Sequence, residues 1–285
     1  MNNKLLFPLL LVSAAGFAVD WPSKSAVMIS NFGGSDAGRP VLGDTFQADG
    51  AVGAIEKGEI IFTRNVSVST SRFHAPLGNM IALDHGDGLL TIYSRIEETH
   101  GEPQKMVNAA ETIGFAGTSG WSKTKGFYLS IFDKKERRWV NPSLIIPVLP
   151  DTRPPSIRSV KLKNSANQII DIAAVSTIRQ GAYTIIVHAE DTRLNAADPP
   201  LMPLRIICSV NGVEAGYLAF ETFSARDGVL MMFRNGLVPV SEIYSHAPAV
   251  EAGEVFFNRG LGTLEIIVQD AGPNSRSAFY RLFIE

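Results

Sequence analysis

Short runs of alternating apolar and polar residues, separated by Gly, Asn and Asp, dominate the chain after its first residues. Successive side chains of a β-strand point to opposite faces, so this period of two predicts half-buried strands. We find no long amphipathic pattern with helix caps. The alternation therefore predicts an all-β protein, with strands in the first half at 51–63, 79–83, 89–93, 112–116 and 127–132.

A proline-rich stretch divides this pattern in two. Four prolines, Pro147, Pro150, Pro154 and Pro155, lie close together, and proline resists both helices and sheet interiors because it fixes φ and has no amide donor. Residues 148–156 are therefore predicted to be a linker between domains at 19–147 and 157–285. Strands spaced as in a β-sandwich are predicted after it, at 157–163, 182–189, 204–210, 217–223, 230–233, 264–269 and 279–284. The length of 285 residues also suits two domains.

The first 18 residues have the pattern of a signal peptide. Lys4 precedes an apolar run at 5–15, and Gly16 and Ala18 are small residues of the kind found before a cleavage site. A buried helix or a membrane anchor is the alternative, but the run is shorter than the about 20 residues that span a bilayer. We expect an exported protein of the periplasm or cell envelope that begins at Val19 and keeps no transmembrane anchor after cleavage.

Composition and charge exclude one class of partner. The net charge is -2 and no Lys/Arg-rich run occurs, whereas nucleic-acid binding needs a basic face. The densest basic cluster, at 134–138, contains Glu136 and follows Asp133, which indicates a solvated hairpin tip.

The single cysteine, Cys208, lies in an apolar strand pattern and is expected to be a buried thiol rather than a nucleophile.

The first predicted domain resembles the lysostaphin/LytM-type zinc endopeptidases of peptidase family M23, which have the duplicated-hybrid-motif fold. The resemblance covers roughly residues 31–147 and rests on segments that occur in the family's order. These are the hairpin turn Asp84-His85-Gly86-Asp87-Gly88, the turn at 113–120, the strand segment at 127–131 and Val140-Asn141-Pro142. It implies a LytM-like β-sheet domain.

The residues that would hold zinc in this family do not recur. The resemblance implies ligands of a His-x-x-x-Asp motif and the second His of His-x-His, and these positions carry Val41, Thr45 and Ser130. A register shifted by one residue makes Asp44 the carboxylate but puts Pro40 at the histidine. The two assisting histidines correspond to Arg95 and Tyr128, and the five histidines of the chain show no metal-ligand spacing. We therefore predict no catalytic residue, no metal ligand and no cofactor.

Three functions remain open at this point. The leading hypothesis is a non-catalytic LytM-like protein that regulates or scaffolds peptidoglycan hydrolysis, because the resemblance includes degenerate relatives that activate cell-wall amidases through the emptied groove. Its candidate binding residues are Val41, Thr45, Arg95, Tyr128 and Ser130, and its partner would be peptidoglycan or a cell-wall amidase or other hydrolase. The alternatives are direct peptidoglycan binding and an active metalloendopeptidase with an unrecognised site. An equally simple interpretation is that Arg95, Tyr128 and Ser130 merely fill the former zinc site and bind nothing.

The second predicted domain resembles the immunoglobulin-like β-sandwiches that are appended to envelope proteins. The resemblance rests on the Asp-x-x-Pro-Pro entry at 151–155, the strand ending in Glu190-Asp191 and the hairpin around Asp270-Ala271-Gly272. Sandwiches share architecture without sharing function. We expect a spacer or a partner-binding module.

Overall fold

The structure is a computed structural model that describes residues 19–67, 74–147, 151–193 and 198–285. Its regular secondary structure is almost entirely β-strand, so the all-β prediction is confirmed. The predicted signal peptide and residues 148–150 of the predicted linker lie outside the described residues. Within the described ranges, no helix is both long and apolar enough to cross a bilayer.

The strands of the N-terminal half (residues 19–147) are β1 (Val27–Ser30), β2 (Ser35–Asp36), β3 (Arg39–Pro40), β4 (Asp44–Gln47), β5 (Ala51–Gly53), β6 (Gly58–Arg64), β7 (Asn79–Asp84), β8 (Leu89–Thr99), β9 (Met106–Val107), β10 (Thr112–Ala116), β11 (Gly126–Asp133) and β12 (Arg138–Val140), followed by the 3-10 helix η1 (Pro142–Leu144). Those of the C-terminal half (residues 151–285) are β13 (Ser156–Asn164), β14 (Ile169–Asp171), β15 (Thr177–Ile178), β16 (Gly181–Glu190), β17 (Arg205–Val210), β18 (Val213–Arg226), β19 (Val229–Arg234), β20 (Leu237–Pro239), β21 (Val250–Phe257), β22 (Gly260–Gln269) and β23 (Ser275–Ile284), with the helix α1 (Val240–Ile243).

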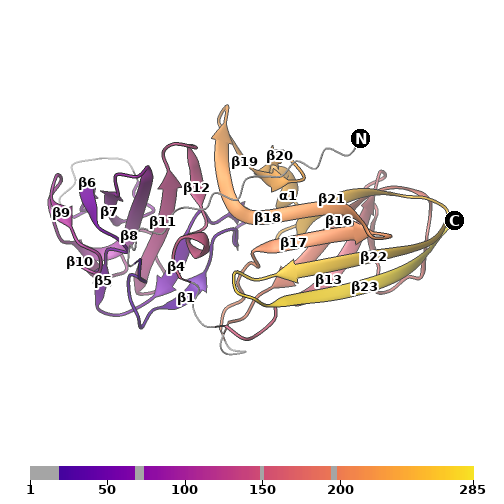
Figure 1. The fold of residues 1–285 in the computed structure, drawn as a ribbon, viewed down its shortest axis with the longest axis horizontal. Helices are drawn as coiled ribbons and strands as arrows, with labels where there is room; N and C mark the ends of the chain where they lie inside the picture. The colour runs from indigo at the N-terminus through magenta and orange to yellow at the C-terminus, as the bar shows by residue number, and fades with distance from the viewer. Residues whose placement is uncertain (1–18, 68–73, 148–150, 194–197) are drawn as a thin grey trace.

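The N-terminal half is built on an antiparallel sheet in the order β6, β7, β8, β11, β4, β1 (Figure 1). Its β7–β8 hairpin closes through the predicted turn, where the Asp84 carboxylate accepts a hydrogen bond of 3.0 Å from the Gly86 N–H and Gly86 has a φ of 82°. β10 pairs with both β5 and β8, which folds the chain back over one end of the sheet.

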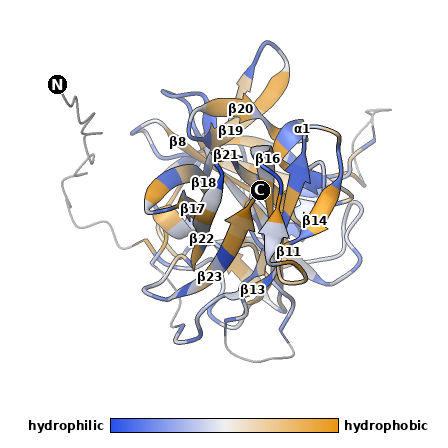
Figure 2. Cartoon of the chain, turned by 90° about the vertical axis from the view of Figure 1, so that its right-hand side faces the viewer, coloured by the Kyte–Doolittle hydropathy of each residue, from blue (hydrophilic) through white to orange (hydrophobic). Residues whose placement is uncertain are grey.

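The C-terminal half is a sandwich of two packed sheets. β14, β13, β16 and β21 form one sheet, and β15, β23, β22, β17 and β18 form the other, which β19 and β20 extend. Side chains from both sheets share one buried core, in which Cys208 is completely buried as predicted. Seen end-on, apolar residues follow the strands and the connecting loops are mostly hydrophilic (Figure 2). The sandwich was expected from the sequence, whereas its immunoglobulin-like assignment and the exact domain boundaries stay predictions.

The two halves are joined by more than the linker. β12 pairs with β18 of the sandwich, with Trp139 opposite Phe223. The buried Asn141 donates its side-chain amide to the Phe220 carbonyl over 2.8 Å, and its backbone N–H to the Glu221 carbonyl over 2.9 Å. Phe32, from the N-terminal half, is fully buried in the core of the sandwich. The halves therefore form one continuous structure.

One predicted strand is wrong in extent. The run at 51–63 was expected to be one strand, but the structure has β5 and β6 with a break between them. Ala54 and Ile55 are both buried, which breaks the alternation of faces, and the Ile55 N–H donates to the Tyr93 hydroxyl instead of a neighbouring strand. The strand predicted at 112–116 matches β10.

Candidate functional site

The candidate groove lies where β4, β11 and β8 run side by side. Thr45 is opposite Tyr128, which is in turn opposite Ser94 of β8, and Ser130 follows two residues along β11. Because side chains alternate along a strand, Thr45, Tyr128 and Ser130 share one face of the sheet. The structure thus places three of the five residues proposed from the sequence on one face of the sheet.

Tyr128 fills the middle of this face. Its side chain is buried, and a Cβ added at Gly43 would lie 2.9 Å from its Cζ atom and 2.2 Å from the Leu129 carbonyl oxygen. A residue larger than glycine therefore does not fit at position 43. Burial raises the pKa of the Tyr128 phenol above its ordinary range, with the charge of Asp44 acting in the same direction, so the ring is neutral at physiological pH. Thr45 and Ser130 beside it are also buried.

Arg95 is held beside the ring by a β-bulge. Asn79 pairs with Ile96 and Met80 with Ser94, so Arg95 is the extra residue in β8. Its φ is 63°, and its N–H donates to the Leu77 carbonyl over 2.8 Å. Its guanidinium carbon lies 5.4 Å from the centre of the Tyr128 ring, within the range of a cation–π contact. Its Nε is buried and has no hydrogen-bond partner.

Val41 and Asp44 do not lie on the face of the sheet that Thr45, Tyr128 and Ser130 share. Val41 is half-buried in the loop before β4, where its N–H donates to the Gly34 carbonyl over 2.8 Å. Asp44 is opposite Leu129 and points to the face away from Tyr128 and Ser130. It is fully buried, and its Oδ1 accepts the Phe32 N–H over 2.9 Å. Burial raises the pKa of Asp44 to about 7.

Comparison with known proteins supports the resemblance of the N-terminal half to peptidase family M23. Residues 43–142 match the family model described as Peptidase family M23. These residues form a domain of peptidase family M23. A second family model, which carries no description of function, matches residues 154–285. An uncharacterized protein of Treponema pallidum (strain Nichols) is 31% identical over 124 residues, which cover 39% of this chain and 83% of that protein.

Solved structures similar to the M23 domain include two peptidase domains. A mutant catalytic domain of the prophage-encoded M23 protein EnpA from Enterococcus faecalis is 18% identical, with a TM-score of 0.35 over 41% of this chain and 87% of that one. The catalytic domain of the antimicrobial peptidase lysostaphin from Staphylococcus simulans is 20% identical, with a TM-score of 0.34 over 38% and 81% of the two chains.

The sequence motifs of the M23 domain have structural roles that the contacts explain. Both ring nitrogens of His85 lie within hydrogen-bond distance of partners, the Lys57 carbonyl at 2.9 Å and the Thr91 hydroxyl at 2.8 Å, so this histidine fixes the β7–β8 hairpin. In the turn after β10, the Ser119 hydroxyl donates to the Ile96 carbonyl over 2.7 Å and accepts the Asn79 N–H over 2.9 Å. These bonds hold the β7–β8 bulge in place.

The structure brings together one cluster that the sequence analysis missed. Asp151, Asp191 and Asp270 each offer a carboxylate oxygen, and these oxygens lie within 4.8 Å of one another. Each residue had been assigned to a separate linker, strand end or turn, and nothing in their spacing along the chain shows that they meet. The only available signal was that Asp270 directly follows one predicted strand and that Asp191 comes two residues after another.

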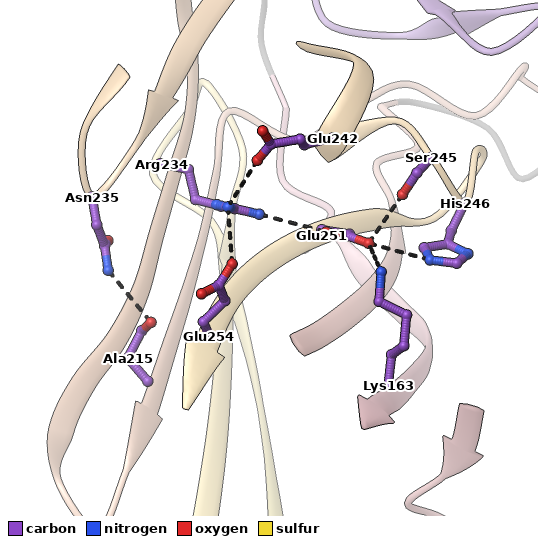
Figure 3. Close-up of polar contacts among 9 residues, drawn as sticks. All are labelled: Lys163, Ala215, Arg234, Asn235, Glu242, Ser245, His246, Glu251 and Glu254. Carbon is purple, nitrogen blue, oxygen red and sulfur yellow. Dashed lines mark hydrogen bonds and ion pairs between the residues drawn. The ribbon is translucent and has the colours of Figure 1, made fainter. Parts of the chain in front are cut away.

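A second polar cluster surrounds the buried Glu251 on β21 (Figure 3). Its carboxylate accepts hydrogen bonds from the Lys163 ammonium and, over 3.0 Å, from the Ser245 hydroxyl. Arg234 lies 3.7 Å away, and the His246 ring nitrogen is 3.3 Å away. The carboxylate is thus compensated within the fold, which favours a structural role.

Proposed function

We propose that this chain is a non-catalytic protein of the cell envelope that regulates or scaffolds peptidoglycan hydrolysis through a metal-free groove in its M23 domain. The observation that carries the proposal is the set of side chains at the groove: buried neutral hydroxyls at Thr45 and Ser130, and the Arg95 cation against the Tyr128 ring. The M23 domain itself indicates a cell-wall-related protein.

These residues do not fit a catalytic zinc ion. Such an ion needs three N, O or S ligands and one open position for water. Val41 offers no lone pair, and neutral Thr45 and Ser130 hydroxyls are poor substitutes for imidazole or carboxylate. The permanent charge of Arg95 opposes a divalent cation, and Asp44 points to the other face of β4. We therefore derive no hydrolytic step for this groove.

The groove suits a partner that carries a carboxylate. In the part of the chain that the structure describes, no acidic side chain lies within ion-pair distance of Arg95, so its guanidinium remains available for a bidentate contact. The adjoining loop presents Trp121 with 71% of its surface exposed, and the Trp121 N–H donates to the Pro76 carbonyl over 3.0 Å. The Leu77 carbonyl accepts the backbone N–H of Arg95, so the segment Pro76-Leu77 anchors the backbones of both Trp121 and Arg95.

An acidic surface of a cell-wall amidase or other hydrolase is the partner we favour, and the exposed Trp121 favours peptidoglycan itself as the second candidate. Arg95→Asn tests both, because asparagine tolerates the positive φ of this position while the cation is removed. We expect binding to weaken about tenfold or more, as for the loss of a hydrogen bond to a charged group. Arg226→Asn, at an exposed strand end of the C-terminal half, is the control.

Two assays separate the candidates. Stimulation of a purified amidase that is lost in Arg95→Asn supports the regulatory function, and co-sedimentation with purified sacculi in the absence of any enzyme supports direct recognition. Unchanged binding of the variant in both assays would remove the groove from consideration. Stoichiometric zinc in the purified protein, together with cleavage of muropeptides, would instead show a working metalloendopeptidase.

A further inference from the structure

Three aspartates from separate segments meet at the end of the sandwich that faces the N-terminal half. Asp191 directly follows β16, Asp270 directly follows β22, and Asp151 belongs to the proline-rich segment that precedes β13. One carboxylate oxygen from each lies within 4.8 Å of the others. The connection between the two halves of the protein therefore carries one member of the cluster.

The cluster is buried and incompletely hydrogen-bonded. Asp191 and Asp270 are only 7% and 4% exposed. Asp270 accepts hydrogen bonds from the Asn274 N–H over 3.1 Å and from its side-chain amide over 2.7 Å, and Asp151 accepts the Arg153 N–H over 2.9 Å. Oδ1 of Asp191, in contrast, is buried without any hydrogen-bond partner. A buried carboxylate oxygen without a hydrogen bond is unfavourable unless a proton or a cation neutralises its charge.

Arg193 brings one positive charge close to this cluster, and it also lines the cavity beside it. Among the described residues, no lysine, arginine or histidine forms an ion pair with any of the three aspartates. Like charges this close in a buried site favour either a shared proton or a bound cation.

A small cavity lies against the cluster. Its volume is about 30 Å³, and its lining includes Asp151 and Asp191 together with Trp21 and Asn31 of the N-terminal half. This space suits a single ion with a water ligand.

We propose that Asp151, Asp191 and Asp270 form a Ca²⁺ site at the junction of the two halves. Carboxylates without any nitrogen or sulfur ligand select hard cations. Ca²⁺ accepts irregular sets of oxygens at about 2.3–2.6 Å, so opposite ligands lie about 4.6–5.2 Å apart, whereas Mg²⁺ requires a near-ideal octahedron at about 2.0–2.1 Å. The bound ion joins the proline-rich segment to two strand ends of the sandwich and stiffens the junction.

Thermal unfolding of a protein that spans residues 19–285, after treatment with a chelator, tests this site. Millimolar Ca²⁺ should raise the melting temperature by about 5 °C if it is present at roughly a hundred times its dissociation constant. Asp191→Asn should abolish this shift and weaken Ca²⁺ binding about tenfold or more, because affinity follows the number of ligand charges. Without Ca²⁺ the variant should melt no lower than the wild type, since charge repulsion is relieved, which also shows that it folds.

The control variant is Asp227→Asn, an exposed turn position with a φ of 49° that asparagine tolerates equally well. It should retain the full Ca²⁺ shift. Tb³⁺ gives a second measurement, because Trp21 lines the same cavity and can sensitise its luminescence. Ca²⁺ should displace the Tb³⁺, and Trp21→Phe should dim the signal while leaving the Ca²⁺ shift unchanged.

The opposite results would overturn the proposal. Absence of a Ca²⁺ shift in the wild type, or an equal shift in Asp191→Asn, would show that the cluster is compensated by a shared proton instead. An equal shift with Mg²⁺ at the same concentration would contradict the assignment to Ca²⁺.

Discussion

Asp44 gives the protein a pH-dependent stability that can be worked out from its surroundings. The carboxyl is fully buried, and only Oδ1 has a hydrogen-bond partner, the Phe32 N–H. Burial raises its pKa from 3.8 to about 7, against smaller opposing effects of that hydrogen bond and of the Arg193 charge. The Asp44 charge in turn adds to the burial that raises the pKa of the Tyr128 phenol, which stays neutral in this range.

The sign of the effect follows from the protons bound in each state. Between about pH 4 and 7 the folded protein keeps the Asp44 proton while the unfolded chain has released it, so stability falls as the pH rises through this window. A pKa difference of this size corresponds to at most about 4 kcal/mol above pH 7. Asp44→Asn keeps an oxygen for the Phe32 N–H and carries no charge at any pH.

Urea unfolding at several pH values between about 4 and 8 measures this contribution. The free energy of unfolding of Asp44→Asn, minus that of the wild type, should grow with pH by up to about 4 kcal/mol. Asp227→Asn, which is exposed, should follow the wild-type curve at every pH. Parallel curves for Asp44→Asn and the wild type would refute the reasoning, because Asp44 would then have the same pKa in both states.

Two further substitutions test the polar contacts that hold the fold. Glu251→Gln leaves the charges of Lys163 and Arg234 without their buried partner and should lower the free energy of unfolding by about 3 kcal/mol in urea, whereas Glu254→Gln, 71% exposed, should change it by less than about 0.5 kcal/mol. Similar losses for both variants would contradict the structural role of Glu251. Asn141→Ala removes the amide bond to Phe220 and the cap on η1, and should cost about 2 kcal/mol and speed amide exchange along β12. Unchanged exchange there would show that Asn141 does not hold the two halves together.

The sequence predicted those parts of the fold in which local patterning and burial agree. Alternation located most long strands, and the turns at 84–88 and 134–137 were found because their polar and glycine residues suit hairpin tips. β21 was missed because Glu251 and Gly253 interrupt its apolar pattern. Glu251 is nevertheless buried, since Lys163 and Arg234 reach it from other strands, and such partners cannot be inferred from one segment alone.

The candidate site could be predicted only where a motif aligned it. The resemblance assigned Thr45, Tyr128 and Ser130 to one groove, and they share a face because β4 and β11 pair with Thr45 opposite Tyr128. The bulge that directs Arg95 over Tyr128 was not predicted, since it depends on hydrogen bonds from a loop and a turn distant in sequence. The three aspartates were missed for the same reason, because only the assembled sandwich brings their strand ends together.

The pairing of β12 with β18 has a practical consequence for anyone who divides this chain. A fragment that stops near Pro147 would present β12 as an unprotected edge and leave Phe32 without its hydrophobic surroundings. Open edges of this kind recruit other strands and lead to aggregation. Poor solubility of an isolated peptidase-like fragment would therefore reflect where the chain was cut, and would say nothing about whether the intact protein folds well.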